Sequence, residues 1–399
     1  MFFHDVKDCY YIATGSCGYH YPSKFWRHSL IGMPHSETAW LWALWGEHCL
    51  LRGKHKKLKY VSKKHTALLY YYAYSLYLQG LFCEASAIIC HFLKLAPEHK
   101  EAIYLYSDCL YSMEKRGEAV LALCVPQVLK RRKTWIKLAN LVEDHADFFR
   151  LQKLYAECVS HSLVSSDDVV VLENMAMGAQ RAGEYKTAEQ IWHHIVGIQK
   201  KGTLRTKVQL NQLFAQEALA AFVSATKKVG LEVFLISGTL LGFVRSGNFL
   251  PHDTDLDIGI FDGFEPDHLK KGIYAAGCFS IMPQRSPHCL RVRHVNGTPI
   301  DIFTHYRDKN DFWHGGVKVS WHNSPFTLKE IQFKGIPVLI PDNPETYLEE
   351  NYGKDWKLPK EKFDSAVDCP NLKIENEYEL RIHHMKNGRI LSAMEDKDD

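Results

Sequence analysis

The chain has 399 residues, enough for two domains that each bury a sizeable core. Hydrophobic residues make up 46% of it and charged residues 24%, a balance that excludes wholesale disorder. The formal net charge of +3 indicates no class of partner. The 11 cysteines form no C-x-x-C pair, which favours reduced thiols in a cytoplasm over a disulfide framework.

The N-terminal part of the sequence shows no signal peptide and no membrane span. Charged residues interrupt the stretch 1–10, where a signal peptide needs an apolar core. The most apolar run, 67–78, is too short to cross a bilayer. We therefore expect a soluble, cytoplasmic protein, with peripheral contact at the inner face of the membrane left open. Residues 1–39 are assigned to no domain.

Residues 66–100 have apolar positions at helical spacing, with Gly80 in a turn and Pro97 after the second helix. This unit resembles a tetratricopeptide repeat (TPR). The spacing recurs further along the chain, at Ile103, Ser107, Ala119, Leu172, Ala176, Ala188 and Trp192. We predict an all-α array of TPR-like helix pairs over 40–199, a module that typically recruits protein or orders another domain.

Two basic clusters, 52–64 and 130–133, lie within this helical half. Such runs are most often solvated helix ends and loops. The functional alternative is attraction to an anionic membrane or to an anionic, lipid-linked glycan. Neither cluster is interleaved with aromatic residues or belongs to a nucleic-acid-binding module, so no nucleic acid partner is expected.

The repeat periodicity stops at residues 200–202, the predicted domain boundary. An amphipathic helix over 204–229 is expected to follow and to pack on the sheet of the second domain. The apolar stretch 233–236 predicts a buried strand. Gly238 and Thr239 then form a turn into a short helix, and its free N–H groups suit a phosphate. We predict both as phosphate-binding residues.

Asp255 and Asp257 lie one residue apart on the next apolar strand, so their side chains point to the same face. Burial of such a pair is costly unless a hard cation, Mg²⁺ or Mn²⁺, lies between the carboxylates. Asp253 joins the same face if the strand has begun there. Asp253 is then a ligand of a second metal, the holder of a metal-bound water or a general base; the alternative is an acidic cap on the preceding loop.

Motifs across the second half of the chain resemble a single protein family. They are 238–242, Arg245, Gly247, 251–259, 299–303 and 347–356. Together they are similar to the LicD/fukutin phosphotransferases, which include bacterial phosphocholine transferases and the ribitol-phosphate transferases fukutin and fukutin-related protein. The resemblance implies a nucleotidyltransferase-like mixed β-sheet flanked by helices over 200–385. With the helical half this makes an α+β protein, and an acidic tail occupies 386–399.

The resemblance also implies a third acid on the strand beside the first pair, and Asp301 is best placed for it. Asp301 would complete the metal site; the alternative is a buried acid paired with a nearby base. The family position of Arg245 favours contact with a diphosphate. Arg291 and Arg293 alternate on one strand face, where they either neutralise the leaving nucleotide or pair with nearby carboxylates.

Two aromatic features accompany this site. His252 stands where many relatives have Trp, a departure that bears on acceptor or base packing and leaves the metal carboxylates intact. Tyr352 and Trp356 belong to an aromatic turn in the C-terminal block, and we expect them to pack against the catalytic core rather than on a base.

The family implies a metal-dependent transferase that moves a phosphorylated alcohol from a CDP-linked donor to a sugar hydroxyl of a cell-surface glycan, releasing CMP. Phosphocholine is the first expectation for the transferred group, followed by ribitol phosphate and glycerol phosphate. Donor, acceptor and the Mg²⁺ or Mn²⁺ cofactor all come from the resemblance. Two alternatives remain open: a nucleotidyltransferase that attaches NMP to a small molecule or protein, and a repeat scaffold with an inactive transferase domain.

Overall fold

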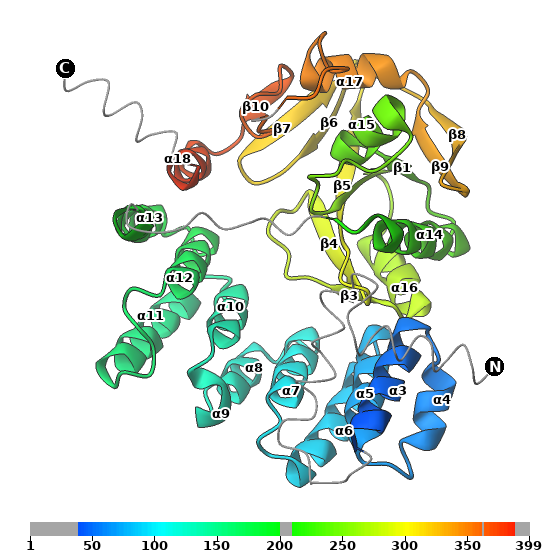
Figure 1. Cartoon of the computed structure of the whole chain (residues 1–399). Helices are drawn as coiled ribbons and strands as arrows, with labels where there is room; N and C mark the ends of the chain where they lie inside the picture. The colour runs from blue at the N-terminus through cyan, green and yellow to red at the C-terminus, as the bar shows by residue number, and fades with distance from the viewer. Residues whose placement is uncertain (1–38, 200–209, 361–362, 388–399) are drawn as a thin grey trace. The chain divides into compact units, whose positions relative to one another are not determined.

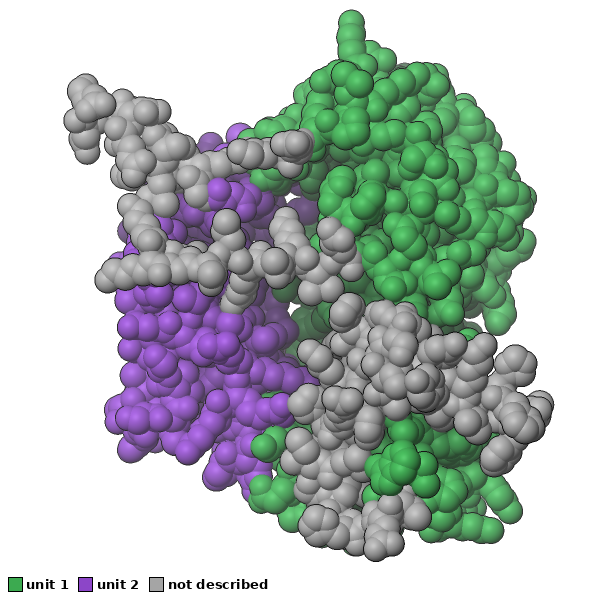
Figure 2. Space-filling view, in the orientation of Figure 1, with its two compact units in different colours: residues 1–115, 207–315, 321–372 green, residues 116–206, 316–320, 373–399 purple. Residues whose placement is uncertain are grey.

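The computed structural model describes residues 39–199, 210–360 and 363–387. The chain divides into two compact units (Figure 2). Unit 1 comprises 1–115, 207–315 and 321–372; unit 2 comprises 116–206, 316–320 and 373–399. Unit 1 thus combines the first described helices with most of the second half of the chain. The predicted boundary at 200–202 lies outside the described residues.

The described residues of unit 1 up to residue 115 form α3 (Ala39–Leu51), α4 (His55–Val61), α5 (Ala67–Leu78), α6 (Phe82–Leu95) and α7 (Lys100–Ser112). The α5–α6 pair occupies the predicted repeat. Ala73 and Ala85 are fully buried in this helical core, where small side chains let helices approach closely. Gly80 turns the chain between the two helices with a φ of 74°. The helix pair is observed, and its assignment as TPR-like stays a prediction.

These helices contact the sheet region of unit 1 through the α5–α6 turn. Phe82 packs edge-on against Tyr274 of α16, with ring centroids 5.4 Å apart. A Cβ atom on Gly80 would lie 2.9 Å from Tyr274 Cγ, closer than real contacts allow. Glycine is therefore needed here both for its backbone angle and for the approach of Tyr274.

Unit 2 contains six consecutive helices and the last helix of the described chain. They are α8 (Arg116–Leu123), α9 (Pro126–Leu129), α10 (Arg132–Asn140), α11 (His145–Ser160), α12 (Val169–Arg181), α13 (Tyr185–Gln199) and α18 (Glu377–Lys386). The basic cluster 130–133 lies at the α9–α10 junction, where Arg132 forms an ion pair with Asp168 at 2.6 Å.

The C-terminal helix α18 packs on α13 within unit 2. The rings of Tyr185 and Tyr378 stack 5.3 Å apart, and the Lys386 ammonium lies 5.1 Å from the centre of the Trp192 ring. Gln180 Nε2 also donates to Glu379 Oε2 at 2.6 Å. The described C-terminal end of the chain therefore contributes to the helical unit rather than to the sheet.

A mixed sheet forms the centre of the second half (Figure 1). Its strands are β1 (Val233–Leu235), β2 (Leu256–Phe261), β3 (Phe279–Ile281), β4 (Cys289–His294), β5 (Pro299–Asp308), β6 (Asp311–Gly315), β7 (Val319–Asn323), β8 (Leu328–Phe333), β9 (Ile336–Pro341) and β10 (Leu372–Ile374). In unit 1 the central order is β6-β5-β2-β1-β9-β8, and β4 also pairs with β5 and with β3. The unit boundaries fall within β7 and β10.

Two of the sheet pairings position the site. β2 runs parallel to β5, and β1 runs antiparallel to β2. All three residues of β1 and four of the six residues of β2 are buried, as expected for a sheet covered by helices. Gly259 leaves room for Phe234 of β1, whose ring would lie 2.4 Å from any Cβ at that position. The mixed sheet flanked by helices agrees with the fold expected for this half.

Four helices accompany the sheet: α14 (Gln212–Lys228), α15 (Ser237–Ser246), α16 (Pro266–Ala276) and α17 (Pro344–Tyr352). α14 corresponds to the helix predicted over 204–229, of which residues 204–209 are outside the described chain. Its Phe222 is fully buried against Phe279 of β3, with ring centroids 5.8 Å apart. The expected packing of this helix on the sheet is confirmed.

Among the described residues, no helix combines the length and the apolar character needed to cross a membrane.

Candidate active site

The turn from β1 into α15 determines where Asp257 lies. Ser237, the first residue of α15, has a φ of 45°, a left-handed value that residues with a side chain rarely adopt. The following N–H, on Gly238, donates to Asp257 Oδ2 at 3.1 Å. Thr239 is buried, and its Oγ1 accepts from the Asp257 N–H at 2.9 Å. Of the two predicted phosphate-binding residues, Gly238 lines the pocket, whereas the hydroxyl of Thr239 is bound to β2.

Four predicted acids gather beside this turn. A Cβ on Gly238 would lie 2.9 Å from Asp253 Oδ2 and 3.3 Å from Asp257 Oδ2, so glycine lets these two carboxylates converge. Asp257 pairs in register with Asp301 across the parallel strands β2 and β5, and neighbouring strands lie about 4.8 Å apart. Asp253, Asp255 and Asp257 line the pocket, whereas Asp301, on the neighbouring strand β5, does not.

Burial and the neighbouring carboxylates raise the pKa of two of these acids, Asp257 and Asp253. Burial raises the pKa of Asp257 well above its usual value, and the charges of Asp255, Asp301 and Asp253 raise it further. Burial, then the charge of Asp255, raises the pKa of Asp253 to about 7. These carboxylates therefore lie in an environment that favours their protonation or the arrival of positive charge.

Arg291 supplies part of that positive charge. Its Nε donates to Asp301 Oδ1 at 2.7 Å, and its Nη2 lies 4.0 Å from Asp255 Oδ2. Arg291 is thus paired with predicted metal ligands, which was one of the two roles left open for it. Arg293 follows on β4 opposite Pro299, away from the carboxylates. Neither arginine lines the pocket.

The chemistry of these side chains fits a hard divalent cation. Carboxylate oxygens are the ligands that Mg²⁺ and Mn²⁺ prefer, and a cation would offset the repulsion that raises the pKa of Asp257. Within residues 39–199, 210–360 and 363–387, no three acidic, histidine or cysteine side chains are already arranged around one point. The metal site therefore stays a prediction.

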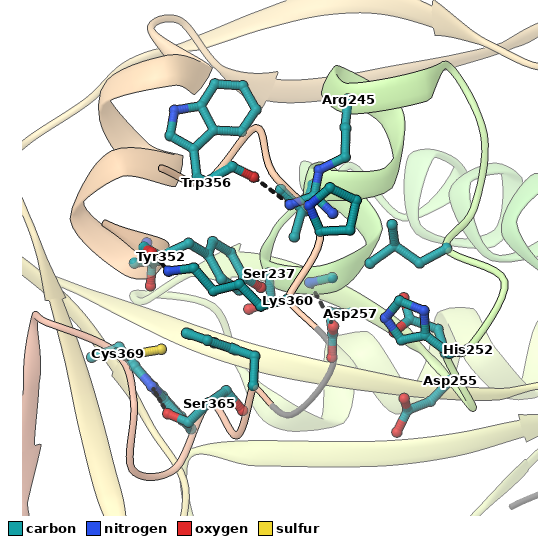
Figure 3. Close-up of a pocket in the computed structure, with 18 of the residues that line it drawn as sticks. Ser237, Arg245, His252, Asp255, Asp257, Tyr352, Trp356, Lys360, Ser365 and Cys369 are labelled. Atoms are coloured by element: carbon teal, nitrogen blue, oxygen red, sulfur yellow. Dashed lines mark hydrogen bonds between the residues drawn. The ribbon is translucent and has the colours of Figure 1, made fainter. Parts of the chain in front are cut away.

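Arg245 joins α15 to the segment that follows α17. One of its Nη2 N–H groups donates to the Trp356 carbonyl (Figure 3). Trp356 itself is buried in the core of the sheet domain and also borders the pocket. The predicted packing of this aromatic residue on the core is confirmed. Arg245 borders the pocket as well, with its guanidinium directed at the protein backbone.

Comparison with known families identifies the sheet domain. Residues 230–343 match the family model described as LicD/FKTN/FKRP, nucleotidyltransferase domain. This domain belongs to the LicD/fukutin family. The matched residues include β1, β2 and β5 with the turn at Gly238, so they contain all four acids of the site.

Individual proteins match this chain over longer stretches than the family model does. The chain is 30% identical to the ribitol-5-phosphate transferase FKTN of Mus musculus over 169 residues, which cover 40% of this chain and 36% of that protein. The Homo sapiens protein of the same name is 29% identical over 171 residues. The uncharacterized protein RP689 of Rickettsia prowazekii is 29% identical over 186 residues, 42% of this chain and 66% of that protein. The chain thus spans about a third of the length of the fukutins that it matches.

A search of solved structures found a likeness to the MamA RS-1 ArsTM double mutant. It covers 42% of this chain and 97% of that one, with a TM-score of 0.31 and 17% identity.

The LicD/fukutin domain encloses a pocket of about 750 Å³ with two different walls. We call the first the acidic wall: Ser237, Gly238, Asp253, Asp255 and Asp257. We call the second the C-terminal wall: Trp321, Asn351, Tyr352, Trp356, Lys360 and Phe363. Figure 3 shows residues of both walls facing the same space. His252 lies at the exposed rim beside the acidic wall.

Several residues of the C-terminal wall were not anticipated from the sequence. Trp321 of β7 stacks on His314 of β6 with ring centroids 5.1 Å apart, and both border the pocket. Lys360 and Phe363 follow α17 in a segment without helix or strand. No motif indicated them, since their positions depend on how β6, β7 and the segment after α17 fold around the acids.

Proposed function

We propose that this protein is a metal-dependent transferase that moves a polyol phosphate from a CDP-linked donor to a sugar hydroxyl of a glycan. The observation that carries the proposal is the convergence of Asp253, Asp255 and Asp257 with the Gly238 turn at one wall of the pocket. Membership of the domain in the LicD/fukutin family supports the reaction class. The name of the fukutin relatives, ribitol-5-phosphate transferase, supports ribitol phosphate as the transferred group.

Asp255 and Asp257 would hold the cation, with Asp301 completing the set once Arg291 releases it. The cation, when bound, neutralises the donor diphosphate. The chain's own contribution is positioning: the Gly238 N–H and the Thr239 hydroxyl keep Asp257 facing the pocket. These contacts hold the carboxylate in place before substrate arrives.

In this proposal the acceptor hydroxyl oxygen attacks the transferred phosphorus. A new P–O bond to the sugar forms as the P–O bond to CMP breaks, and CMP leaves with the electron pair. Asp253 would accept the hydroxyl proton; this role is supported by its carboxylate, which lies close to Gly238 beside that of Asp257, and by its position in the pocket lining. We choose this role for Asp253 over those of a second metal ligand and an acidic cap.

As the group transferred from the donor, we favour a polyol phosphate over phosphocholine. A quaternary ammonium is best bound by an aromatic cage without nearby cations. The C-terminal wall has aromatic rings, but it also carries the Lys360 ammonium, and Arg245 lies beside it. A polyol offers hydroxyl groups that suit a mixed polar and aromatic surface such as the one near Ser365.

The test measures which product leaves. Purified protein with Mg²⁺ or Mn²⁺ is expected to release CMP from CDP-ribitol, and less from CDP-glycerol and CDP-choline, when a glycan acceptor is present. Release of pyrophosphate from an NTP, with no CMP from any CDP-alcohol, would establish the nucleotidyltransferase alternative. A protein that binds neither Mn²⁺ nor CDP would instead support the inactive scaffold.

The helical half completes the proposal. We propose that TPR-like helix pairs recruit or position the glycan acceptor or a protein that carries it, with the basic residues 52–64 and 130–133 as the contact to an anionic partner. The cytoplasmic location, with peripheral contact at the membrane, belongs to this proposal too and rests on the sequence. None of the nine cysteines in the described part of the chain forms a disulfide.

A further inference from the structure

One arginine and one lysine, Arg245 and Lys360, lie among the described residues that line the pocket. The donor of the proposed reaction carries a diphosphate, and the carboxylates of the acidic wall would offset part of the charge of the cation that binds it. A second source of positive charge is therefore useful on the opposite side. The contacts of the two side chains decide which of them is available.

Arg245 is anchored to the protein by one of its five N–H donors. Its Nη2 donates to the Trp356 carbonyl, and its Nε is buried without a hydrogen-bond partner among the described residues. This contact holds the start of the segment 356–360 against α15, so Arg245 positions the C-terminal wall of the pocket.

Lys360 presents its ammonium differently. Its Nζ donates to the Tyr352 carbonyl at 2.9 Å and lies 2.8 Å from Asp355 Oδ1. It also lies 5.4 Å from the centre of the Phe363 ring. The side chain is 35% exposed, and it lines the pocket with Ser237 and Asp257 (Figure 3). An ammonium has three N–H donors, and these two contacts leave one of them for a ligand.

We propose that Lys360 binds the diphosphate of the donor nucleotide, with Arg245 as the residue that positions the wall carrying it. The proposal rests on the proposed function in that it takes the ligand to be a nucleoside diphosphate ester. The diphosphate then lies between the cation of the acidic wall and the Lys360 ammonium. Asp355 and the Tyr352 carbonyl hold the ammonium at the pocket while its third N–H contacts a phosphate oxygen.

The test compares Lys360 with Lys357. Both follow α17, both approach an aromatic ring, and both form an ion pair with an acid, but Lys357 does not line the pocket. CDP and cytidine binding to the full-length protein are measured by calorimetry with and without Mn²⁺. Lys360→Met is expected to weaken CDP binding at least about tenfold and to leave cytidine binding unchanged. Lys357→Met should leave both unchanged, and Lys360→Arg should retain most of the CDP affinity.

A second variant separates phosphate binding from support of the wall. Asp355→Asn removes the ion pair but keeps the ammonium. If Lys360 only stabilises the fold of the C-terminal wall, both Asp355→Asn and Lys360→Met will weaken cytidine binding as much as CDP binding. That result overturns the proposal. Equal CDP affinities for Lys360→Met and Lys357→Met overturn it as well.

These binding results are independent of the proposed reaction. Selective loss of CDP binding in Lys360→Met supports the diphosphate contact even if the enzyme releases pyrophosphate from an NTP instead of CMP. Conversely, CMP release from a CDP-alcohol by a Lys360→Met variant with unchanged CDP affinity would sustain the proposed function and reject the role of Lys360.

Discussion

The two walls of the pocket differ in how they are built. The acidic wall is local: β1, the turn at Gly238 and β2 follow one another in the chain, and one parallel pairing adds Asp301. The C-terminal wall is assembled from β7, α17 and the segment after it, and the Arg245 to Trp356 contact ties it to α15. This difference suggests that the acidic wall determines the chemistry and that the C-terminal wall determines how the donor is held.

The largest effect is expected on the acidic wall. Asp257→Asn should lower turnover by at least about 10²-fold, because the amide keeps the shape but cannot hold a cation as a carboxylate does. The same change should maintain or raise the melting temperature, since burial and three neighbouring carboxylates disfavour the charged form of Asp257. Steady-state CMP release and a thermal melt test the pair of outcomes. Near-normal turnover would remove Asp257 from the chemistry.

A substitution of Arg291 tests whether Asp301, its partner on β5, takes part in binding the cation. Arg291→Met leaves the Asp301 carboxylate without its partner at 2.7 Å, so the metal-free protein should lose about 1–3 kcal/mol of stability. Because the vacated carboxylate becomes available to a cation, Mn²⁺ should raise the melting temperature of this variant more than that of the wild type. Differential scanning calorimetry with a Mn²⁺ titration measures both. An identical Mn²⁺ response in the two proteins would place the cation away from Asp301.

A pH titration addresses the support of the C-terminal wall. His314, which stacks under Trp321, also stacks on the fully buried His305 with ring centroids 4.3 Å apart. Burial lowers the pKa of His305 to about 3, so the unfolded chain binds a proton there that the folded protein does not. The contribution of the neutral His305 side chain to the free energy of unfolding is fully present above the unfolded pKa of about 6.5. This contribution is lost as pH falls from there towards 3.

For His305 alone, the free energy of unfolding should fall by about 2 kcal/mol between pH 7 and pH 5. His305→Phe should reduce this acid sensitivity, because the aromatic packing against Phe234 is kept without a titrating group. Urea unfolding at the two pH values makes the comparison, with His252→Phe at the pocket rim as the control. An unchanged difference between the two pH values in His305→Phe would contradict the assignment.

The smallest effect is expected at the link between the walls. Arg245→Met removes the bond to the Trp356 carbonyl and should cost about 1 kcal/mol of stability. If the C-terminal wall holds the donor, KM for the CDP-alcohol should rise several-fold while kcat changes little. Initial-rate kinetics separate the two. A fall in kcat at constant KM would instead indicate that Arg245 acts on the transferred phosphate.

The sequence by itself determined the acidic wall because that wall depends on short-range rules. The sequence predicted that strand alternation brings Asp255 and Asp257 to one face, whereas β2 begins only at Leu256, so the loop before this strand carries Asp253 and Asp255 to the pocket. The glycine turn precedes the three acids in the chain. Family motifs pointed to Asp301, and the register of β2 with β5 then placed it beside Asp257. The helical character of the first half and the helix before β1 also followed from periodicity.

Only the tertiary structure decided which groups meet across long stretches of chain. Lys360 and Asp257 line one pocket although more than a hundred residues separate them in the sequence. Arg245 appeared from its motif to face a diphosphate, but the fold directs its guanidinium to the Trp356 carbonyl. Likewise, α3–α7 join the sheet in unit 1 and α18 packs on α13 in unit 2. Such packing depends on shape and burial between distant segments, which periodicity and motif spacing do not encode.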